Sequence, residues 1–500
     1  SRSFVKYVDL GPVSYYGQVH NFNGNQSTNI ELSIFGEEKE FIYDMFNILP
    51  SHEMTPFVPA MMKPGKNKAG KYGSPITVGA VKLCAERKPL NPVSLKKAED
   101  VLFNQIVTNL TSINVSRDKH PIDMETVING HVDDYLSRPI DKSKSGGFGY
   151  PGKKSRYLEK HLIDDREVYE PTPVLYSDIN LIFENYEHGF MTSPVFKAAL
   201  KDEVRSVEKY NAFKTRVFYA TPFPLLMVQK SVMSPLYTLM LEHPTLFYTG
   251  LSIDMHRRGQ LIKHDLVTFC LAHGSEVNIS EGDYGSFDTG MPYEIGRSTC
   301  NLSYRLLKWL GYNDLQLMLV TGILTDLLHP RVDYFGDLIE VPGLQPSGKY
   351  ATAEDNSLRN LLILMYIWYD NPDTKELNFF DYVLPRVYGD DFVGAVLDSV
   401  SKSYNNIVIR DGCLKMGLDF TSSAKGDVVD AFIDVKDMSF LKRTFRLHRA
   451  LDREVACLHP SSLVKMLQYF EPSDSVGAVL QYENICNSAL TEFFFWINYE

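Results

Sequence analysis

The sequence lacks closely spaced cysteines. Its six cysteines include no C-x-x-C pair and lie far apart along the chain: Cys84, Cys270, Cys300, Cys413, Cys457 and Cys486. This spacing argues against a zinc ribbon and against a dense disulfide framework, so we expect reduced thiols. The thirteen histidines include no H-E-x-x-H motif and no His-Cys cluster, and none is assigned to zinc.

Long apolar runs are also missing. The longest, such as residues 361–368, fall well short of the roughly 20 residues needed to cross a bilayer, so no transmembrane segment is predicted. The first five residues contain neither an initiator Met nor an apolar signal core. We therefore expect an N-terminus made by processing or by design, and no secretion.

The chain has no excess of positive charge. Lys and Arg number 51 against 62 Asp and Glu, which gives a net charge of -11 and argues against a histone-like protein. Nucleic-acid binding is not excluded, because a basic cleft can exist on an acidic body. The 500 residues are 44% hydrophobic and 23% charged, as in a globular protein, and they contain no repeat or low-complexity tract. We expect one interwoven unit with a large core.

Two segments rich in Gly and Lys, residues 63–74 and 142–156, are predicted to be surface loops. From the start of the second loop to residue 160, Glu159 is the only acid among six basic residues: Lys142, Lys144, Lys153, Lys154, Arg156 and Lys160. This segment is a candidate track for phosphates.

Acidic residues are predicted at the ends of strands. Residues 277–280 alternate apolar and polar side chains, as a strand does, and lead to Asp283. Residues 387–393 indicate two short strands around a tight turn at Gly389, with Asp390 and Asp391 at its tip. Each pattern alone is common, and a Gly-Asp-Asp turn is usually an ordinary solvated hairpin. Two divalent cations about 3.5 to 4 Å apart, however, require carboxylates from separate strand ends, and Mg2+ prefers oxygen ligands.

A helix is predicted over residues 352–368, just after Pro346-Ser347-Gly348. Thr352 and Asn356 are four positions apart, so their side chains share one face of this helix. Ser347 could also serve as its N-cap.

Together, these motifs resemble those of the RNA-dependent RNA polymerases of positive-strand RNA viruses, specifically the picornavirus-like branch, over about residues 145–443. The matching segments, in the family's order, are Ser145-Gly146-Gly147-Phe148 with Gly152-Lys153-Lys154; Lys201-Asp202-Glu203-Val204-Arg205 with Lys209, Lys214, Thr215 and Arg216; Asp283-Tyr284-Gly285-Ser286-Phe287-Asp288; Pro346-Ser347-Gly348 with Thr352 and Asn356-Ser357; Tyr388-Gly389-Asp390-Asp391; Gly417-Leu418 with Lys425; and Phe440-Leu441-Lys442-Arg443. Val204 replaces the family's Leu, and Phe213 replaces its Gly.

The resemblance implies an α+β, right-hand polymerase fold with closed fingertips, in which the palm is an antiparallel sheet flanked by helices. The implied regions are fingers at 1–240 and 293–344, palm at 241–292 and 345–445, and thumb at 446–500. The region before Lys201 is longer than in picornavirus enzymes, the stretch after Arg443 is short for a whole thumb, and Ser1 replaces the usual Gly. These departures favour a dicistrovirus, iflavirus or marine relative and a chain trimmed at its C-terminal end.

The resemblance also assigns roles to individual residues. Asp283 and Asp390 would hold Mg2+, which Mn2+ can replace, with Asp391 as a supporting acid, and Lys425 would be the general acid for pyrophosphate. The implied NTP contacts are Lys209, Lys214 and Arg216 at the triphosphate, Asp288, Thr352 and Asn356 at the ribose 2'-OH, and Ser347. The implied RNA contacts are Ser145, Gly147, Lys153, Lys154, Lys201, Arg205, Gly348, Lys442 and Arg443.

Simpler interpretations exist for several of these residues. Any single Lys of residues 201–216 can be a solvated surface residue, and residues 440–443 can be a basic strand end. His256 and His264 are expected at the surface or as satisfied core residues, and residues 493–496 are expected to pack rather than to stack on bases.

The activity implied is RNA-templated addition of NTPs to an RNA 3'-OH, with an RNA template and primer and with priming by a genome-linked protein. The implied location is the host cytoplasm, in membrane-associated complexes with viral replication proteins. A reverse transcriptase would share the palm, but a DNA-making palm generally has a bulky aromatic residue where this chain has Asp288. An inactive palm used as an RNA-binding scaffold would be signalled by loss of Asp283 or Asp390, and both are present.

Overall fold

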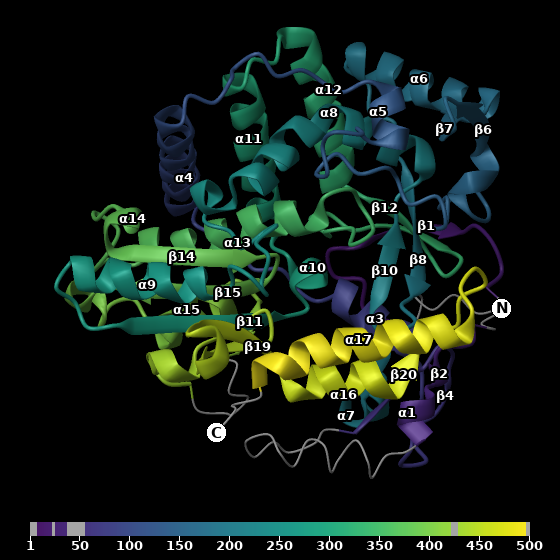
Figure 1. Ribbon diagram of the computed structural model, residues 1–500. Helices are drawn as coiled ribbons and strands as arrows, with labels where there is room; N and C mark the ends of the chain where they lie inside the picture. The colour runs from purple at the N-terminus through teal and green to yellow at the C-terminus, as the bar shows by residue number, and fades with distance from the viewer. Residues whose placement is uncertain (1–7, 23–25, 38–55, 422–428, 497–500) are drawn as a thin grey trace.

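The computed structural model describes residues 8–22, 26–37, 56–421 and 429–496. Within these ranges the chain forms two main sheets, several small sheets and helices that surround them (Figure 1). None of the helices in these ranges has the length and apolar character required to cross a bilayer.

The strands form seven sheets. The four-stranded sheet has the order β14 (Val383–Tyr388), β15 (Asp391–Val396), β11 (Asn278–Gly285) and β16 (Asp419–Thr421). The five-stranded sheet has the order β1 (Ser14–Gln18), β13 (Asp337–Glu340), β12 (Arg331–Tyr334), β8 (Val195–Leu200) and β10 (Val217–Ala220). The three-stranded sheet is β17 (Ser439–Phe440), β18 (Arg443–His448) and β19 (Arg453–Leu458). The paired strands are β2 (Glu31–Leu32) with β20 (Tyr469–Phe470), β3 (Phe57–Pro59) with β9 (Val204–Ser206), β4 (Gly65–Lys66) with β5 (Tyr72–Gly73), and β6 (Leu158–Ile163) with β7 (Arg166–Pro171).

The helices are distributed along the whole described chain. Those before the four-stranded sheet begins are α1 (Ile34–Glu37), α3 (Pro75–Leu83), α4 (Pro92–Ser112), α5 (Met124–Asn129), α6 (Pro173–Glu187), α7 (Val207–Asn211), α8 (Phe223–Glu242) and α9 (Gln260–Ala272). Those that follow β11 are α10 (Phe287–Gly290), α11 (Tyr293–Trp309), α12 (Asp314–Leu328), α13 (Thr352–Tyr369), α14 (Phe379–Tyr382), α15 (Asn406–Lys415), α16 (Pro460–Gln468) and α17 (Ala478–Trp496).

Local sequence signals account for many helix starts. Ser74 and Asn91 each accept a hydrogen bond from the first turn of α3 and α4, and each is followed by a Pro that suits the first helical position. Asn313 and Gln316 form a reciprocal capping box at the start of α12. The ends of these helices are therefore set by residues adjacent in the sequence.

The four-stranded sheet confirms the predicted strands and hairpin. It is antiparallel, with Gly282 opposite Phe392 and Tyr388 opposite Asp391, so the β14–β15 turn lies beside the end of β11. All four strands fall in the stretches that the resemblance implies for the palm, whose boundaries stay a prediction.

Helix α13 forms the centre of the core. Every residue from Asp355 to Tyr369 is buried, because α13 packs against α4, α11, α15 and β14. The predicted helix over residues 352–368 is thereby confirmed. The suggestion that Ser347 caps it is wrong: the helix begins at Thr352 with Ala351 at the N-cap, in a left-handed conformation and without a side-chain cap.

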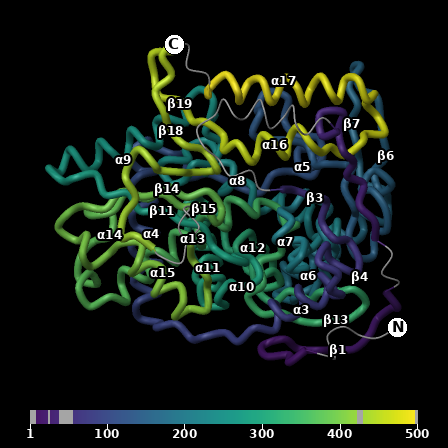
Figure 2. The backbone as a smooth tube through the Cα atoms, turned by 90° about the horizontal axis from the view of Figure 1, so that it is seen from below, coloured from purple at the N-terminus to yellow at the C-terminus, as the bar shows by residue number. Residues whose placement is uncertain are grey.

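A segment near the start of the described chain pairs with a segment near its end. Strand β2 pairs with β20, and the Tyr469 hydroxyl donates to the carbonyl of Phe57 at 2.8 Å. Figure 2 shows the N-terminal chain reaching the C-terminal helices along one edge, and in Figure 1 α16 and α17 run below β8 and β10. Gly36 has no room for a side chain here, because a Cβ would lie 2.3 Å from the carbonyl oxygen of Gln468. A contact between the N-terminal and C-terminal regions is what the closed fingertips implied by the resemblance require.

The C-terminal aromatic residues pack as expected. Phe493, Phe495 and Trp496 are buried in a small core with α16 and β19, whereas Phe494 is partly exposed. The six cysteines are free thiols, as predicted.

A buried carboxylate fastens the loop after α6 to α12. Asp326, 1% exposed, accepts hydrogen bonds from the Tyr186 hydroxyl at 2.6 Å, the Thr192 amide at 3.0 Å, the Thr192 hydroxyl at 2.8 Å and the Ser193 amide at 3.2 Å. Removing it would leave several buried donors without an acceptor.

We expect Asp326→Ala to lower the free energy of unfolding by about 3 kcal/mol, because the loss of one acceptor strands these donors. The midpoint of thermal unfolding measures this. Asp314→Ala, at an exposed position on the same helix, is the matched control and should shift the midpoint far less. Equal shifts would contradict the anchoring role of Asp326.

Candidate active site

Three acidic side chains gather at one end of the four-stranded sheet. Asp283 lies near the end of β11, and Asp390 and Asp391 lie at the β14–β15 hairpin beside it. Burial, reinforced by the charge of Asp283, raises the pKa of Asp390 to about 6. Burial likewise raises the pKa of Asp391 to about 7, with added repulsion from Asp283 and Asp390. The fold thus concentrates negative charge at this point.

Helix α13 holds the hairpin turn in place. Gly389 has a φ of 57°, a left-handed conformation that costs Gly little. Its amide donates to the Ser357 hydroxyl at 2.9 Å, and the Asn360 amide donates to the carbonyls of Gly389 at 3.0 Å and Asp391 at 3.1 Å. The Tyr284 hydroxyl, from β11, donates to Asn360 at 2.9 Å. One buried asparagine therefore links α13, β11 and the hairpin.

Asn360 was not among the predicted site residues. Its spacing from Asn356 and Ser357 places all three on one face of α13, and this 3.6-residue periodicity of polar residues in a buried helix was the available signal.

Asp391 contacts the next hairpin rather than only the acidic cluster. Its carboxylate accepts from the Leu441 amide at 2.6 Å and from the Phe392 amide at 3.0 Å. Leu441 and Lys442 form the two-residue turn between β17 and β18, and both have positive φ values, 54° and 57°. This turn is unfavourable for non-Gly residues, so the bond from Asp391 helps to hold it, and Lys442 is left exposed at its tip.

Two of the three predicted ribose-binding residues, Asp288 and Asn356, meet near the acids. The Asn356 amide donates to Asp288 at 2.8 Å, and burial raises the pKa of Asp288 while this bond lowers it. Thr352 lies apart from this pair: its hydroxyl contacts the carbonyls of Ser347 at 3.2 Å and Lys349 at 2.9 Å. Thr352 therefore fixes the loop before α13.

The loop at Ser347 and Gly348 is packed against β10. The Gly348 amide donates to the Tyr219 carbonyl at 3.1 Å, and a Cβ on Gly348 would lie 2.4 Å from that same oxygen. Only Gly fits this approach. The Ser347 hydroxyl is buried and has no hydrogen-bond partner among the residues that the structure describes.

The basic segment from residue 201 to 216 is organised by one acid. Glu203 pairs with Arg216 through both guanidinium nitrogens that face it, and lies 3.5 Å from Arg205 and 3.6 Å from Lys201. The bond to Glu203 raises the pKa of Arg216, and the charges of Asp390 and Asp288 act on the same guanidinium. Arg216 thus belongs to the electrostatic environment of the acidic cluster.

Lys209 and Lys214 lie on the exposed side of this segment, on either side of Phe213. Phe213 has a φ of 56°, the left-handed conformation that the family's Gly would adopt without strain. Its ring is buried against Gly73, where a Cβ would lie 2.6 Å from the ring. Burial of the ring offsets the strain of this substitution.

The loop of residues 145–154 combines close packing with exposed charge. Gly147 has a φ of 83°, and a Cβ on it would lie 2.7 Å from the Thr221 carbonyl oxygen. Lys154 is buried, and its ammonium donates to the Ser145 carbonyl at 2.8 Å, so it holds the loop together. Ser145 and Lys153 are exposed and remain accessible for RNA.

Arg443 is also engaged within the protein. Its guanidinium forms two hydrogen bonds of 2.8 Å with Glu492 in α17, and a third of 2.9 Å with the Ala456 carbonyl. His256 contacts the same carboxylate at 2.6 Å. In the predicted basic pair, Lys442 is therefore the exposed member. Lys425 lies outside the described residues.

The chemistry of the acidic cluster fits divalent cations. Three carboxylates from two neighbouring strands supply the oxygen ligands that Mg2+ and Mn2+ prefer. Burial and the charge of Asp283 both raise the pKa of Asp390 and of Asp391, and a bound cation would offset this unfavourable negative charge. As the side chains stand, no three His, Cys, Asp or Glu residues in the described ranges are arranged to hold an ion. Ion binding would therefore draw these carboxylates together.

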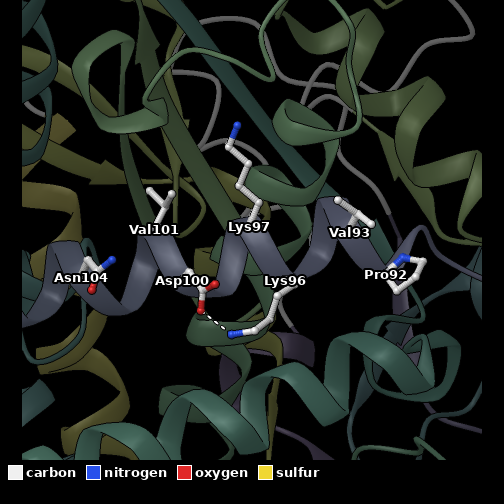
Figure 3. Close-up of a pocket in the computed structure, with 7 residues that line it drawn as sticks. All are labelled: Pro92, Val93, Lys96, Lys97, Asp100, Val101 and Asn104. Atoms are coloured by element: carbon white, nitrogen blue, oxygen red, sulfur yellow. Dashed lines mark hydrogen bonds and ion pairs between the residues drawn. The ribbon is translucent and has the colours of Figure 1, made fainter.

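A separate surface depression lies along α4 and contains none of the predicted site residues. Figure 3 shows the side chains that line it, all from one helix, with Lys96 and Asp100 paired at 2.5 Å. Because one helix forms it, it is an open surface without converging catalytic groups.

Comparison with known proteins agrees with this geometry. The family profile described as "Viral RNA-dependent RNA polymerase" matches residues 59–495. The replicase polyprotein of Cricket paralysis virus is 25% identical over 432 residues, which are 80% of this chain and 23% of the relative. That of Drosophila C virus is 26% identical over 450 residues, 84% of this chain and 25% of the relative. The chain thus spans about a quarter of the curated polyproteins that it matches.

The fold has a counterpart among solved structures. The sicinivirus 3Dpol RNA-dependent RNA polymerase superposes with a TM-score of 0.71 at 17% identity, covering 97% of this chain and 94% of the other. This match confirms the right-hand polymerase fold, and the family match confirms the resemblance that the motifs indicated. The chain belongs to the viral RNA-dependent RNA polymerase family.

Proposed function

We propose that this chain adds nucleoside monophosphates from NTPs to an RNA 3'-OH, directed by an RNA template, with release of pyrophosphate. The observation that carries the proposal is the placement of Asp283 beside Asp390 and Asp391, with the Asp288–Asn356 pair adjacent to them. Acids that hold cations and a polar pair that can recognise a ribose hydroxyl are the two features that such a polymerase requires.

Asp283 and Asp390 would hold two Mg2+ or Mn2+ ions, with Asp391 supporting them. Bound ions of this kind neutralise the charge of the phosphates and make the attacking hydroxyl more acidic. Asp391 contributes a second effect, because its bond to the Leu441 amide keeps the hairpin with Lys442 next to the acids.

The remaining residues would bind and orient the substrates. Arg216, oriented by Glu203, would lie over the triphosphate together with Lys209 and Lys214. The Asp288 carboxylate would accept a hydrogen bond from the 2'-OH, and Asn356 would hold Asp288 in position. A deoxyribose would leave this buried carboxylate without a partner, which selects NTPs over dNTPs.

RNA would follow the basic surfaces that the packing leaves exposed. Lys153 and Ser145, which are exposed, are proposed for the template, with the buried Gly147 shaping their loop. Gly348 is proposed at the incoming template nucleotide, and Lys442 at the primer backbone. Lys201 and Arg205 would add positive charge near Glu203. Lys154 and Arg443 would contribute by holding their segments in position.

The proposal also covers the domain boundaries, the general acid, the initiation mode and the location of the chain. We infer fingers at 1–240 and 293–344, palm at 241–292 and 345–445, and thumb at 446–500. Lys425 is proposed as the general acid for pyrophosphate. Initiation on a genome-linked protein and recruitment to membrane-associated replication complexes in the host cytoplasm are proposed from the similarity to replicase polyproteins.

Primer extension on a defined RNA template with Mg2+ and NTPs tests the reaction. We expect Asp390→Asn to lower extension by roughly 1,000-fold or more, because the neutral amide binds cations poorly. RNA affinity should change by less than about threefold, because backbone electrostatics lie elsewhere. Asp381→Asn, an exposed acid near the opposite end of the hairpin, is the control. A wild-type chain that binds RNA without extending it, even with Mn2+, would favour the scaffold alternative.

The ribose role is tested by competition between NTPs and dNTPs. We expect Asp288→Ala and Asn356→Ala each to reduce the ratio of kcat/KM for NTP to that for dNTP by about 10- to 100-fold, because the 2'-OH loses its acceptor or that acceptor loses its support. An unchanged ratio in both variants would remove the ribose-sensing assignment.

Cation binding predicts a pH-dependent stabilisation. The raised pKa values of Asp390 and Asp391 mean that their contribution to stability without cations is complete below about pH 4 and is lost as pH rises through about 6 and 7. Mg2+ or Mn2+ binds the ionised carboxylates, so it should raise the thermal midpoint by several degrees at pH 8 and little at pH 5. Asp390→Asn should abolish most of this gain. An equal gain at both pH values, or in KCl of matched ionic strength, would contradict the assignment.

A further inference from the structure

One buried glutamine connects the two residues assigned to the ribose. The Gln345 side chain is fully buried, and its amide nitrogen donates to Asn356 Oδ1 at 2.8 Å and to Asp355 Oδ2 at 2.5 Å. Its backbone amide donates to the carbonyl of Asp288 at 3.1 Å. Gln345 therefore contacts both members of the Asp288–Asn356 pair.

The second acceptor of the Gln345 amide is Asp355, a buried carboxylate that is paired with two basic side chains. Asp355 lies 2.7 Å from the Arg359 guanidinium and 3.1 Å from the Lys349 ammonium, and all three side chains are at most 4% exposed. Burial would raise the pKa of Asp355, but the charges of Arg359 and Lys349 hold it below its usual range. Asp355 is accordingly an ionised acceptor with a fixed position.

This arrangement sets the orientation of two amides in turn. An ionised carboxylate can only accept, so Gln345 must present its NH2 group to Asp355 and thereby to Asn356. Asn356 must then present Oδ1 to Gln345 and its NH2 group to Asp288. A flipped Asn356 would place donor against donor at Gln345 and acceptor against acceptor at Asp288.

This orientation has an energetic cost at the oxygen of the Gln345 amide. Its Oε1 is buried and has no hydrogen-bond partner within the described part of the chain. An unpaired buried acceptor is unfavourable, so the two bonds made by the NH2 group determine the orientation of the side chain.

We propose that Gln345 is a positioning residue for nucleotide selection, which acts by fixing the Asn356 amide so that Asp288 stays a pure acceptor for the ribose 2'-OH. Lys349, Asp355 and Arg359 form the charged anchor of this relay. The inference rests on the proposed ribose role of Asp288 and Asn356 and adds a residue that does not itself touch the nucleotide.

The test replaces the amide by a side chain of similar size without donors. Gln345→Met should lower the NTP to dNTP ratio of kcat/KM by about tenfold, because Asn356 can then turn its amide and lose its bond to Asp288. Gln229→Met is the matched control: Gln229 is also fully buried, but among the described residues its side chain bonds only to the backbone of Tyr350, at 3.3 Å in both directions. It should leave the ratio within twofold of wild type.

A double-mutant cycle separates positioning from general destabilisation. In an Asn356→Ala background, Gln345→Met should change the ratio by less than about twofold, because the amide that it positions is gone. An equal fall in both backgrounds, or no fall in the wild-type background, would overturn the proposal while leaving the effect of Asn356→Ala intact. If Asn356→Ala by itself leaves the ratio unchanged, the role of Asn356 fails and the relay fails with it, whereas the ribose assignment as a whole falls only if Asp288→Ala is also without effect.

A second variant covers the case in which Gln345→Met does not fold. Gln345→Leu is shorter than Met and also lacks donors, so it should free the Asn356 amide and lower the ratio about as much. A folded Gln345→Leu variant with wild-type discrimination would overturn the proposal.

Discussion

The site depends on one constraint: acids of like charge must be kept close together in a partly buried place. Asp283, Asp390 and Asp391 repel one another: burial and the charge of Asp283 both raise the pKa of Asp390 and of Asp391. Without a restraint, this repulsion would push the β14–β15 hairpin, which carries two of these acids, away from β11. Helix α13 supplies the restraint, because Ser357 and Asn360 bond to the turn from a helix that is itself buried from Asp355 to Tyr369.

The same helix also carries Asn356, which is proposed to take part in nucleotide selection. Asn356 lies one turn before Asn360, so a single rigid element positions the ribose pair and the hairpin relative to each other. The charged anchor of Asp355 and Arg359 lies on α13 as well, four positions apart. Because α13 is packed on several sides, a small shift of this helix would disturb both functions together.

Much of this site could be predicted from local sequence. The alternation before Asp283, the Gly389 turn and the periodicity of residues 352–368 each depend on neighbours in the chain, and the structure has a strand, a hairpin and a helix there. The roles of Lys154 and Arg443 could not be predicted. Arg443 is bound by Glu492, which lies 49 positions later, and such a partner is brought near only by tertiary packing.

The fate of the basic residues shows how an acidic chain can still bind a polyanion. Some basic residues are buried and paired with an acid, as Lys349 and Arg359 are with Asp355. Others project from turns whose geometry is held by acids: Lys442 extends from a turn bonded to Asp391. A net charge of -11 therefore says little about local surfaces, because internal ion pairs cancel in the sum and leave the exposed lysines as the basic groups available to a polyanion. The acids proposed to hold cations and the lysines proposed to meet the RNA backbone are in this way parts of one packed arrangement.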